Sequence, residues 1–567
     1  MPALELTFDR LERLLGRKVD VSQLEYDLLW LGLDLKDVQE DRVKVEYEPN
    51  RPDFSSPEGI ARALRGYYEM ELGLPKFELG TSDVVLEVDP SVNRVRPYVV
   101  AGLVRNVDLE DDEIATLMNI QEALHHVLGR GRKKVAIGVH DFDKVVPPFV
   151  YKAIDPDGIK FRPLQMEAYE MTPREILEEH PKGVEYAHVL AGAEVYPIIV
   201  DANDDVLSFP PIINGHLTTV TEDTRTLFLD LTGTDFSAVN YALNILATCL
   251  ADMGTLVETV TVKYADPKPP VPEPTIVTPD FSTTRWEVDV KFVNSYLGTK
   301  LSAKQMVKCL QKVRLGATVH PKKRGKLLVE VPAYRVDLMH PVDFIEEVAI
   351  GYNYKNLSLT TREGGVGSYH PTFELANRAR TVLAWAGYLE MFNFILTNSR
   401  REFEHVGLTS EESSCVGILN PVSREYDTTR VTLLPGLLWN LQANKHVEKP
   451  LRLFEVGDVV LVDGRAETGA TREVHAAVVT HWANADFSEA RSVLDFFARS
   501  LGVFEATKVV PVEHPTFLPG RAGQVRVEGE PVGTIGEVHP RVLENFELEM
   551  PVAAFEVNLE AFLKGKK

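Results

Sequence analysis

Four carboxylates lie close together in the segment 331–354, VPAYRVDLMHPVDFIEEVAIGYNY, around a proline that can begin a helix. Residues three and four apart share one face of a helix, so the acids after the proline are expected to converge, with the acid before it folding back toward them. Hard oxygen donors without histidine or cysteine suit Mg²⁺. The alternative is that acids in a first turn only complement the helix dipole. The candidate ligands are Asp337, Asp343, Glu346 and Glu347.

Threonines are concentrated in the segment 207–235, LSFPPIINGHLTTVTEDTRTLFLDLTGTD. Threonines that alternate with apolar residues usually form an antiparallel strand with one solvent-facing side. The alternative is the floor of a polar pocket, in which hydroxyl groups and Asp230 hold a small ligand.

A basic island interrupts an acidic background in the segment 129–145, GRGRKKVAIGVHDFDKV. Cations beside flexible glycines suit contacts to phosphates, although a solvated loop would have the same composition. The basic residues are Arg130, Arg132, Lys133 and Lys134. The histidines, His140 and His475 among them, have no partner at a spacing that indicates a metal or a nucleophile, and we interpret them as ordinary histidines. The sequence contains no motif of serine hydrolases, P-loop NTPases or common zinc sites.

Hydrophobic periodicity indicates which elements position these residues. Near the N-terminus it predicts amphipathic helices around residues 11–15 and 24–29. A strand, a turn and a helix follow, with Ser56 as the helix N-cap and Pro57 in the first turn.

The rest of the chain alternates between helical and strand patterns. Strands are expected over 84–89, 97–104, 194–202, 326–332, 451–462 and 472–482. Helices are expected over 240–254, 292–298, 302–313 and 374–391, and after Pro341. Six prolines in 264–281 indicate an extended spacer that divides the chain into halves, and the glycine-rich segment 361–371 indicates a softer boundary.

Length and composition limit the class of protein. A chain of 567 residues exceeds the roughly 250–300 that one core supports, so several domains are expected. The formal net charge of −23 argues against a protein that coats nucleic acid along a broad surface, so any nucleic acid would meet local patches. No apolar stretch approaches a membrane span, no signal peptide is recognised, and three scattered cysteines point to a reducing cytoplasm.

Taken together, the motifs resemble the β subunit of phenylalanyl-tRNA synthetase in its shorter archaeal and eukaryotic form. The resemblance runs through nearly the whole chain, and the short length fits the form without the oligonucleotide-barrel insertion. It is carried by EPNRPDFSSPEGIARAL, GVHDFDKVVPPFVY, the threonine-rich segment, the acidic segment, NPVSREYDTTRVTLLPGLLWNL, LRLFEVGDVV and HPTFLPGRAGQVRVEGEPVGTIGEVHPRVLENF.

The resemblance implies an α/β and α+β multidomain fold. The expected parts are 1–85, a small α+β N-terminal domain; 86–265, an α/β editing domain; 266–279, a proline-rich linker; 280–356, a helical, winged, magnesium-associated domain; and 366–567, a class II synthetase-like antiparallel sheet without catalytic function. It further implies an α₂β₂ enzyme whose α subunit holds ATP and phenylalanine. FEVGDVV stands where an active class II enzyme needs an arginine for ATP, so no catalytic residue for aminoacylation is expected here, and Arg430 is interpreted as structural.

The resemblance also gives roles to the candidate residues. The four carboxylates would hold Mg²⁺ near the α subunit, and the basic island would contact tRNA(Phe). The editing domain would hydrolyse tyrosyl-tRNA(Phe), with Asp230 accepting the phenol, Ser208 and Thr232 as further polar contacts, and water as the nucleophile. One departure is Asn214–Gly215, where relatives commonly have Asn–Ser. The alternatives are a tRNA-binding scaffold with an inactive pocket and a deacylase that acts without α.

Overall fold

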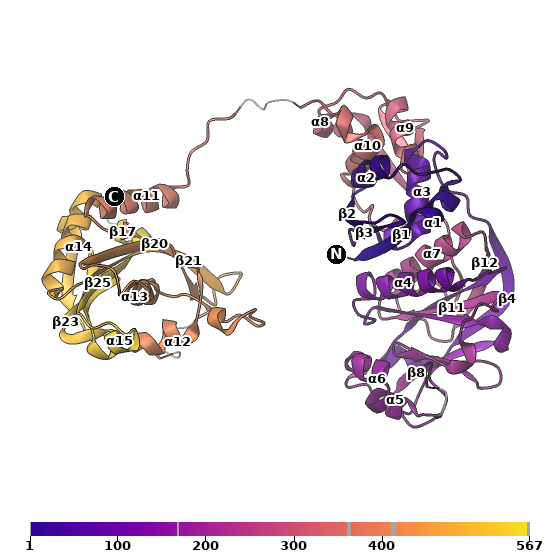
Figure 1. The fold of residues 1–567 in the computed structure, drawn as a ribbon, viewed down its shortest axis with the longest axis horizontal. Coiled ribbons are helices and arrows are strands. Elements are labelled where there is room, and N and C mark those ends of the chain that lie inside the picture. The colour runs from indigo at the N-terminus through magenta and orange to yellow at the C-terminus, as the bar shows by residue number, and fades with distance from the viewer. Residues whose placement is uncertain (1, 167–168, 360–363, 410–414, 564–567) are drawn as a thin grey trace. The chain divides into compact units, whose positions relative to one another are not determined.

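The computed structural model describes residues 2–166, 169–359, 364–409 and 415–563. The chain forms two compact units, Met1–Thr361 and Arg362–Lys567. The division falls at the start of the glycine-rich segment 361–371, whose first three residues lie outside the described ones. Each unit is described by itself below (Figure 1).

The N-terminal layer is a three-stranded antiparallel sheet in the order β1-β3-β2, covered by three helices. The strands are β1 (Ala3–Thr7), β2 (Leu33–Val38) and β3 (Arg42–Tyr47), and the helices are α1 (Phe8–Leu15), α2 (Val21–Trp30) and α3 (Pro57–Tyr67). Leu11 and Leu24 are buried as expected, whereas Leu29 is half exposed. Ser56 caps α3 as predicted, because its Oγ accepts the Gly59 N–H at 3.0 Å.

The largest element is a ten-stranded mixed sheet in the order β10-β9-β8-β7-β4-β12-β5-β11-β6, with β13 added beside β12. Its strands are β4 (Leu79–Val88), β5 (Tyr98–Arg105), β6 (Val135–Asp141), β7 (Phe149–Ile154), β8 (Tyr196–Val200), β9 (Val206–Phe209), β10 (Ile213–Asn214), β11 (Thr226–Gly233), β12 (Leu256–Tyr264) and β13 (Thr275–Thr278). Helices α4 (Asp111–Val127) and α7 (Phe236–Asp252) lie side by side against it (Figure 1).

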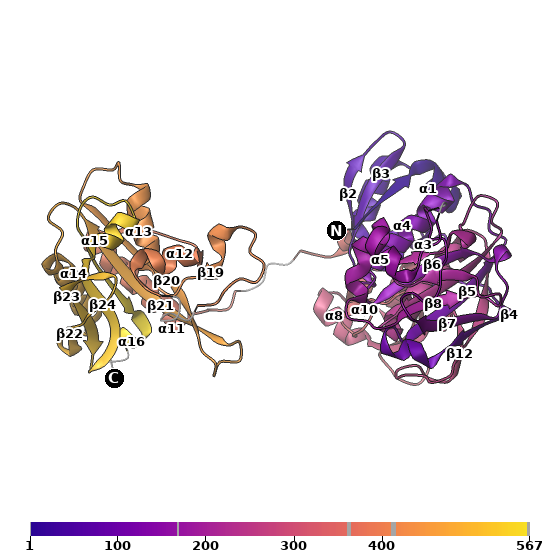
Figure 2. The ribbon, with the colours of Figure 1, turned by 90° about the horizontal axis from the view of Figure 1, so that it is seen from below.

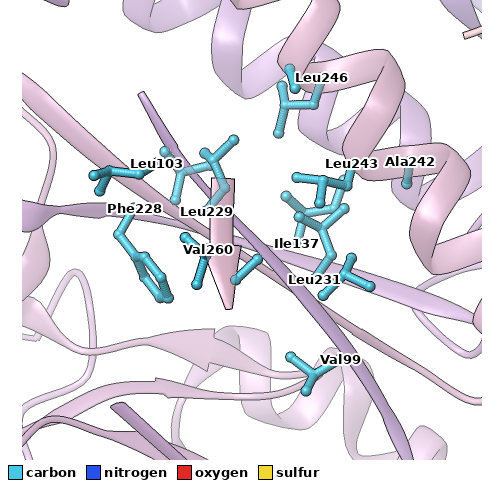
Figure 3. Close-up of a cluster of buried hydrophobic side chains, with 14 of the residues drawn as sticks. Val99, Leu103, Ile137, Phe228, Leu229, Leu231, Ala242, Leu243, Leu246 and Val260 are labelled. Atoms are coloured by element: carbon cyan, nitrogen blue, oxygen red, sulfur yellow. The ribbon is translucent and has the colours of Figure 1, made fainter. Parts of the chain in front are cut away.

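The core of this part lies between α7 and the sheet. Figure 3 shows Leu243 of α7 close to Ile137 and Leu231 of the central strands, with Leu246 further along the same helix. Helix α7 is apolar over most of its circumference, which explains why nearly all of its second half is buried.

The threonine-rich segment does not form the half-exposed strand that alternation predicted. It divides into β9, β10, a short 3₁₀ turn (His216–Thr218) and β11. Strand β11 pairs with β5 on one side and β6 on the other, and all eight of its residues are buried. Both faces of β11 are therefore inside the protein, and Asp230 is an interior carboxylate.

The proline-rich segment does not separate two compact units, because both of its flanks lie in unit 1. The part expected as the linker 266–279 contains β13, which pairs with β12, and the Tyr98 hydroxyl donates to the Pro269 carbonyl. The prolines do limit the segment to an edge position, as the missing N–H groups require.

The third part of unit 1 has a three-stranded antiparallel sheet, β14-β16-β15, packed with three helices. These elements are β14 (Thr284–Asp289), α8 (Val290–Leu297), α9 (Ala303–Lys312), β15 (Gly316–Val319), β16 (Lys326–Val331) and α10 (Asp343–Tyr352). They share a core that includes Val293, Leu310, Val329 and Phe344.

Unit 2 is a seven-stranded sheet in the order β17-β20-β21-β25-β24-β23-β22, antiparallel except for the short β17–β20 pair. Helices α11 (Pro371–Trp385), α14 (Phe487–Leu501) and α16 (Leu559–Leu563) cover one face, and α13 (Leu434–Ala443) and α15 (Pro540–Asn545) cover the other (Figure 2). The strands are β17 (Leu389–Glu390), β20 (Leu451–Val462), β21 (Ala470–His481), β22 (Thr507–Pro511), β23 (Phe517–Val527), β24 (Glu530–Val538) and β25 (Val552–Asn558).

The helix expected over 374–391 ends earlier, at Trp385. Gly387 has φ +85°, a left-handed conformation that stops the helix, and β17 takes the remaining residues. Among the described residues no helix has the length and apolar composition that crossing a membrane requires.

Candidate functional site

The large sheet of unit 1 curls until its two end strands approach each other. The Asn214 side chain on β10 donates to the Val139 carbonyl on β6 at 3.3 Å, and Arg132 donates to the Ile212 carbonyl at 2.9 Å. A cavity of about 410 Å³ lies there, within the size range of small-molecule sites. Its lining combines apolar side chains, Leu117, Ile137 and Ile212, with the polar side chains of Ser208, Thr218 and Asp230.

Asp230 is the buried carboxylate of this cavity, with 1% of its surface exposed. Its Oδ2 accepts hydrogen bonds from His140 Nε2 at 2.6 Å and from Ser208 Oγ at 3.3 Å. Its Oδ1 has no hydrogen-bond partner among the residues that the structure describes. One oxygen is thus held by the protein and the other is left for a ligand.

His140 connects Asp230 to a second polar group of the cavity. Its other nitrogen, Nδ1, lies 2.7 Å from Thr218 Oγ1, and its side chain is fully buried. From the sequence we interpreted this residue as an ordinary histidine and did not expect it at the site. Its partners stand 78 and 90 residues away, so no local spacing could have indicated them.

Gly138 makes room for this arrangement. It is the register partner of Asp230 across β6 and β11, two residues before His140. A Cβ at this position would lie 2.2 Å from Asp230 Oδ2 and 2.6 Å from His140 Nε2, closer than real atoms approach.

Thr232 does not line the cavity, although it was expected in the pocket with Ser208 and Asp230. It is fully buried, and its Oγ1 accepts the Nε–H of Arg96 at 2.9 Å. Burial lowers the pKa of Arg96 to about 10. Thr232 therefore stabilises a buried guanidinium behind the cavity wall.

The backbone around Gly215 leaves no space for a side chain, including the serine that the resemblance led us to expect. A Cβ there would lie 2.3 Å from the Val206 carbonyl oxygen. The Gly215 N–H donates to the Leu207 carbonyl at 2.7 Å, and the Gly215 carbonyl is 3.3 Å from Thr218 Oγ1. In this chain the backbone of Gly215, not a side chain, belongs to the cavity wall.

The basic island divides into inward and outward residues. Arg130, Gly131 and Arg132 all have left-handed φ angles, and this turn directs Arg132 into the protein. Arg132 lines the cavity, lies over the Tyr186 ring and pairs with Glu122 at 2.6 Å, while Lys134 pairs with Asp235 at 2.8 Å. Of the four predicted tRNA contacts, Arg130 and Lys133 are exposed.

Arg132 and His125 set the charge of Glu122 beside the cavity. A hydrogen bond from His125 and the charge of Arg132 lower the pKa of Glu122 to about 2. Burial lowers the pKa of His125 to about 4, so this histidine is neutral at pH 7. Glu122 therefore carries a negative charge beside Arg132 throughout the physiological pH range.

The four carboxylates predicted to hold Mg²⁺ do not converge. Asp337 and Glu347 both pair with the Arg335 guanidinium, at 2.7 Å and 2.5 Å. Glu347 is buried and Asp337 is partly buried. Helix α10 begins at Asp343, two residues after Pro341, and the Asp343 carboxylate accepts the backbone N–H groups of residues 339 and 340. Glu346 is exposed and accepts the Tyr354 hydroxyl.

Among the described residues no group of three or more His, Cys, Asp or Glu side chains lies close enough to hold a metal ion. The donor chemistry suits Mg²⁺ but this arrangement does not, since the Arg335 guanidinium already neutralises two of the four acids. The Mg²⁺ ion stays a prediction, and no step of the chemistry below depends on it.

Arg430 in unit 2 is held entirely by the protein. Its guanidinium pairs with Glu455 at 2.6 Å and donates to the Asp458 carbonyl at 2.7 Å, with 5% of the residue exposed. This geometry agrees with the structural role inferred from the sequence.

Three family models match the sequence, in this order along the chain. They are the B3/4 domain over residues 96–248, the tRNA synthetase B5 domain over 286–354, and the phenylalanyl tRNA synthetase beta chain CLM domain over 358–559. The cavity lies within the first match and the four carboxylates within the second.

Curated relatives match over the full length. The phenylalanine–tRNA ligase beta subunit of Methanothrix thermoacetophila is 41% identical over 563 residues, which cover 99% of this chain and 100% of that protein. The beta subunit of Archaeoglobus fulgidus is 42% identical, with 99% of each chain covered. Among solved structures, an N-terminal fragment of the beta subunit from Pyrococcus horikoshii is 36% identical, with a TM-score of 0.59, covering 62% of this chain and 99% of the fragment.

Proposed function

This chain belongs to the family of phenylalanine–tRNA ligase beta subunits, and we propose that it edits tyrosine attached in error to tRNA(Phe) within an α₂β₂ ligase. In this enzyme the α subunit uses ATP to attach phenylalanine to tRNA(Phe) in the cytoplasm. The observation that carries the editing role is the cavity in which a buried carboxylate, Asp230, has one oxygen with no hydrogen-bond partner in the described part of the chain.

The need for editing follows from the two amino acids. An apolar pocket cannot strongly reject an isostere that adds a hydroxyl, so a charging site for phenylalanine also admits tyrosine. A second site succeeds if it recognises the hydroxyl. Asp230 Oδ1 accepts the phenol, and Leu117, Ile137 and Ile212 contact the ring. Phenylalanine would leave the buried carboxylate oxygen without a partner, which costs free energy.

The rest of the pocket suits an aminoacylated tRNA end. Arg132 brings a guanidinium to the cavity, and the exposed Arg130 and Lys133 stand in the same turn. Guanidinium and ammonium groups are the ordinary partners of phosphates. The net charge of −23 makes such a local patch necessary for any tRNA contact.

The surface of unit 2 supports a role in assembly with the α subunit. It exposes a run of large apolar side chains, and soluble monomers rarely expose extended apolar patches. The run lies within residues 385–394, where Trp385 is 75%, Leu389 66%, Phe392 87% and Phe394 72% exposed. We propose that this run contacts the α subunit. The Arg430 guanidinium is paired with Glu455 and is not free to bind ATP, so the α subunit would carry the aminoacylation site.

The test compares the parent complex of this chain and its α subunit with Asp230→Ala, using preformed tyrosyl-tRNA(Phe). Loss of a hydrogen bond to a charged acceptor is worth roughly 1.5–3 kcal/mol, so hydrolysis should fall about tenfold or more. Phenylalanine charging should be unchanged. Asp157→Ala is the matched control, because Asp157 is an exposed acid of the same unit that pairs with Arg174 and does not line the cavity.

Two outcomes would contradict the proposal. Hydrolysis at the parental rate in Asp230→Ala would remove Asp230 from recognition. A parent that fails to clear tyrosyl-tRNA(Phe) would indicate a scaffold with an inactive pocket.

A further inference from the structure

We propose that Thr218, His140 and Asp230 form one hydrogen-bonded relay, in which Thr218 is the group that takes a proton from the attacking water. This inference rests on the proposed editing function and identifies the path by which the attacking water loses its proton, through Thr218 to His140. His140 is a positioning residue that acts through Thr218, and Asp230 has a second role besides contacting the phenol.

The relay is continuous and shielded from solvent. Thr218 Oγ1 lies 2.7 Å from His140 Nδ1, and His140 Nε2 lies 2.6 Å from Asp230 Oδ2. The three residues are 1% or less exposed, and the Phe228 ring lies beside the imidazole with centroids 6.3 Å apart. Thr218 and Asp230 line the cavity whereas His140 stands behind it, so the two ends of the relay face a ligand.

The protonation pattern follows from the partners. An ionised carboxylate only accepts, so His140 Nε2 carries a proton and donates it to Asp230. In the neutral imidazole Nδ1 is then the acceptor, and the Thr218 hydroxyl donates to it. The lone pairs of Thr218 Oγ1 are thereby left to accept a hydrogen bond from a water molecule in the cavity.

The same geometry provides for the other protonation state. When Nδ1 gains a proton it donates to Thr218 Oγ1, and the hydroxyl hydrogen needs another acceptor. The Gly215 carbonyl lies 3.3 Å from Thr218 Oγ1 and supplies it. Both states of the imidazole are therefore hydrogen-bonded without movement of the backbone.

The proposed step balances as an ester hydrolysis. The water oxygen forms a bond to the carbonyl carbon of the tyrosyl ester, its proton passes to Thr218 Oγ1, and the threonine proton passes to His140 Nδ1. The imidazolium is stabilised by Asp230 Oδ2. On collapse the bond between the carbonyl carbon and the ribose oxygen breaks, and the proton returns through Thr218 to that oxygen. The products are tyrosine and tRNA with a free terminal hydroxyl.

The first test uses Thr218→Val, which keeps the shape of the side chain and removes the hydroxyl. General-base catalysis contributes typically 10²–10⁴-fold, so kcat for tyrosyl-tRNA(Phe) hydrolysis by the full complex should fall about a hundredfold or more, with KM within about threefold of the parent. Thr218→Ser, which keeps the hydroxyl, should recover most of the rate. Thr248→Val is the matched control, since Thr248 is equally buried and its hydroxyl donates to backbone carbonyls of α7.

A second measurement separates the relay from a packing role. His140→Gln keeps a donor for Asp230 but takes up no proton, so it should lower kcat as Thr218→Val does. Because the residues act as one unit, the double variant should be about as slow as the slower single variant. The hydrolysis rate of the parent, plotted against the D₂O fraction of H₂O/D₂O mixtures, should give a curve, because more than one proton moves in the transition state. The same plot for Thr218→Val should be linear.

Three results would contradict the relay, and they differ in what they say about the editing function. If the parent hydrolyses tyrosyl-tRNA(Phe) and Thr218→Val does so at the same kcat, the relay is wrong while the editing function stands. If the losses in the double variant multiply, the residues are independent and the relay is wrong. If the parent does not hydrolyse the substrate, the proposed function fails together with the relay.

Discussion

Arg335 decides what the neighbouring carboxylates can do. Its guanidinium holds Asp337 and Glu347 in contacts of 2.7 and 2.5 Å, with 1% of the side chain exposed. Burial opposes charge on Asp337, but the attraction of Arg335 outweighs it and lowers the Asp337 pKa. The same acids are ion-pair partners here and the predicted ligands of an ion.

Arg335→Leu should therefore destabilise the protein strongly. Removing one member of a buried ion pair leaves uncompensated charges and costs about 3–5 kcal/mol in the free energy of unfolding. Urea unfolding of the full chain measures this loss. Arg285→Leu is the control, because Arg285 pairs with Glu330 at an exposed position and should cost less than about 1 kcal/mol. Equal effects of the two changes would contradict the account.

The Mg²⁺ prediction can be tested on the same variant. Without the guanidinium, Asp337 and Glu347 repel each other and are free to coordinate a cation, so millimolar Mg²⁺ should restore part of the stability of Arg335→Leu. The double variant that also carries Glu347→Gln should not recover. No response of Arg335→Leu to Mg²⁺ would count against an ion at these residues.

At the residue scale, Ser208 and Asp230 line the cavity, Thr232 does not, and His140 contacts Asp230 although it was interpreted as an ordinary histidine. Asp230 was recognisable through the motif around it, while Thr232 stands two residues later on β11 but contacts Arg96 instead of the cavity. The role of His140 depends on pairing across strands, which spacing along the chain does not reveal.

At the scale of elements, the register of β6 against β11 builds the cavity. It places Gly138 opposite Asp230, where a side chain would collide with the carboxylate and His140. Elements with a strong period were predicted well, as with β20 over 451–462. The curl that brings β10 against β6 was not, because it depends on contacts between distant strands.

Gly138→Ala should therefore impair editing more than folding. The added methyl displaces Asp230 and His140, so hydrolysis of tyrosyl-tRNA(Phe) by the full complex should fall at least tenfold, while phenylalanine charging is retained. Gly80→Ala on β4 is the control, since its nearest neighbour is the flexible Glu258 side chain at 3.0 Å. Unchanged hydrolysis in Gly138→Ala would show that this register does not shape the pocket.

Strands β21 and β25 of unit 2 carry a pH-sensitive pair. Burial opposes charge on His475, but hydrogen bonds to Glu473 and Glu556 outweigh it and raise the His475 pKa to about 9. The His475 Nδ1 to Glu556 Oε1 distance is 2.7 Å. The pair is thus charged at neutral pH, and the histidine ring joins the two strands.

The sign of the pH dependence follows from the raised pKa. A histidine that titrates near 6.5 unfolded and near 9 folded contributes its full stabilisation below pH 6.5 and loses it as the pH rises through 9. The difference amounts to about 3 kcal/mol in the free energy of unfolding. Unfolding measured from pH 6 to pH 10 should show this loss in the parent and a flatter profile in His475→Gln; parallel profiles would contradict it.

At the scale of the whole molecule, the proposed editing site and the proposed assembly surface lie in different units. Unit 1 holds the cavity, and unit 2 presents the exposed apolar run around Phe392 and Phe394. A stable assembly that covers this run should bury above about 2,000 Å² in total, the size of obligate interfaces. From the sequence we expected several domains, with the main division at the proline-rich segment. That position was wrong, because composition does not reveal that β13 pairs with β12.

The measurement that tests the central claim most directly is phenylalanine charging of tRNA(Phe) by this chain alone and after mixing with its α subunit. The account predicts no charging by the isolated chain, and charging by a complex with two copies of each subunit in light scattering. Robust charging by the isolated chain, or an α subunit that charges fully without forming the complex, would contradict the claim that this protein is the β subunit of a phenylalanine–tRNA ligase.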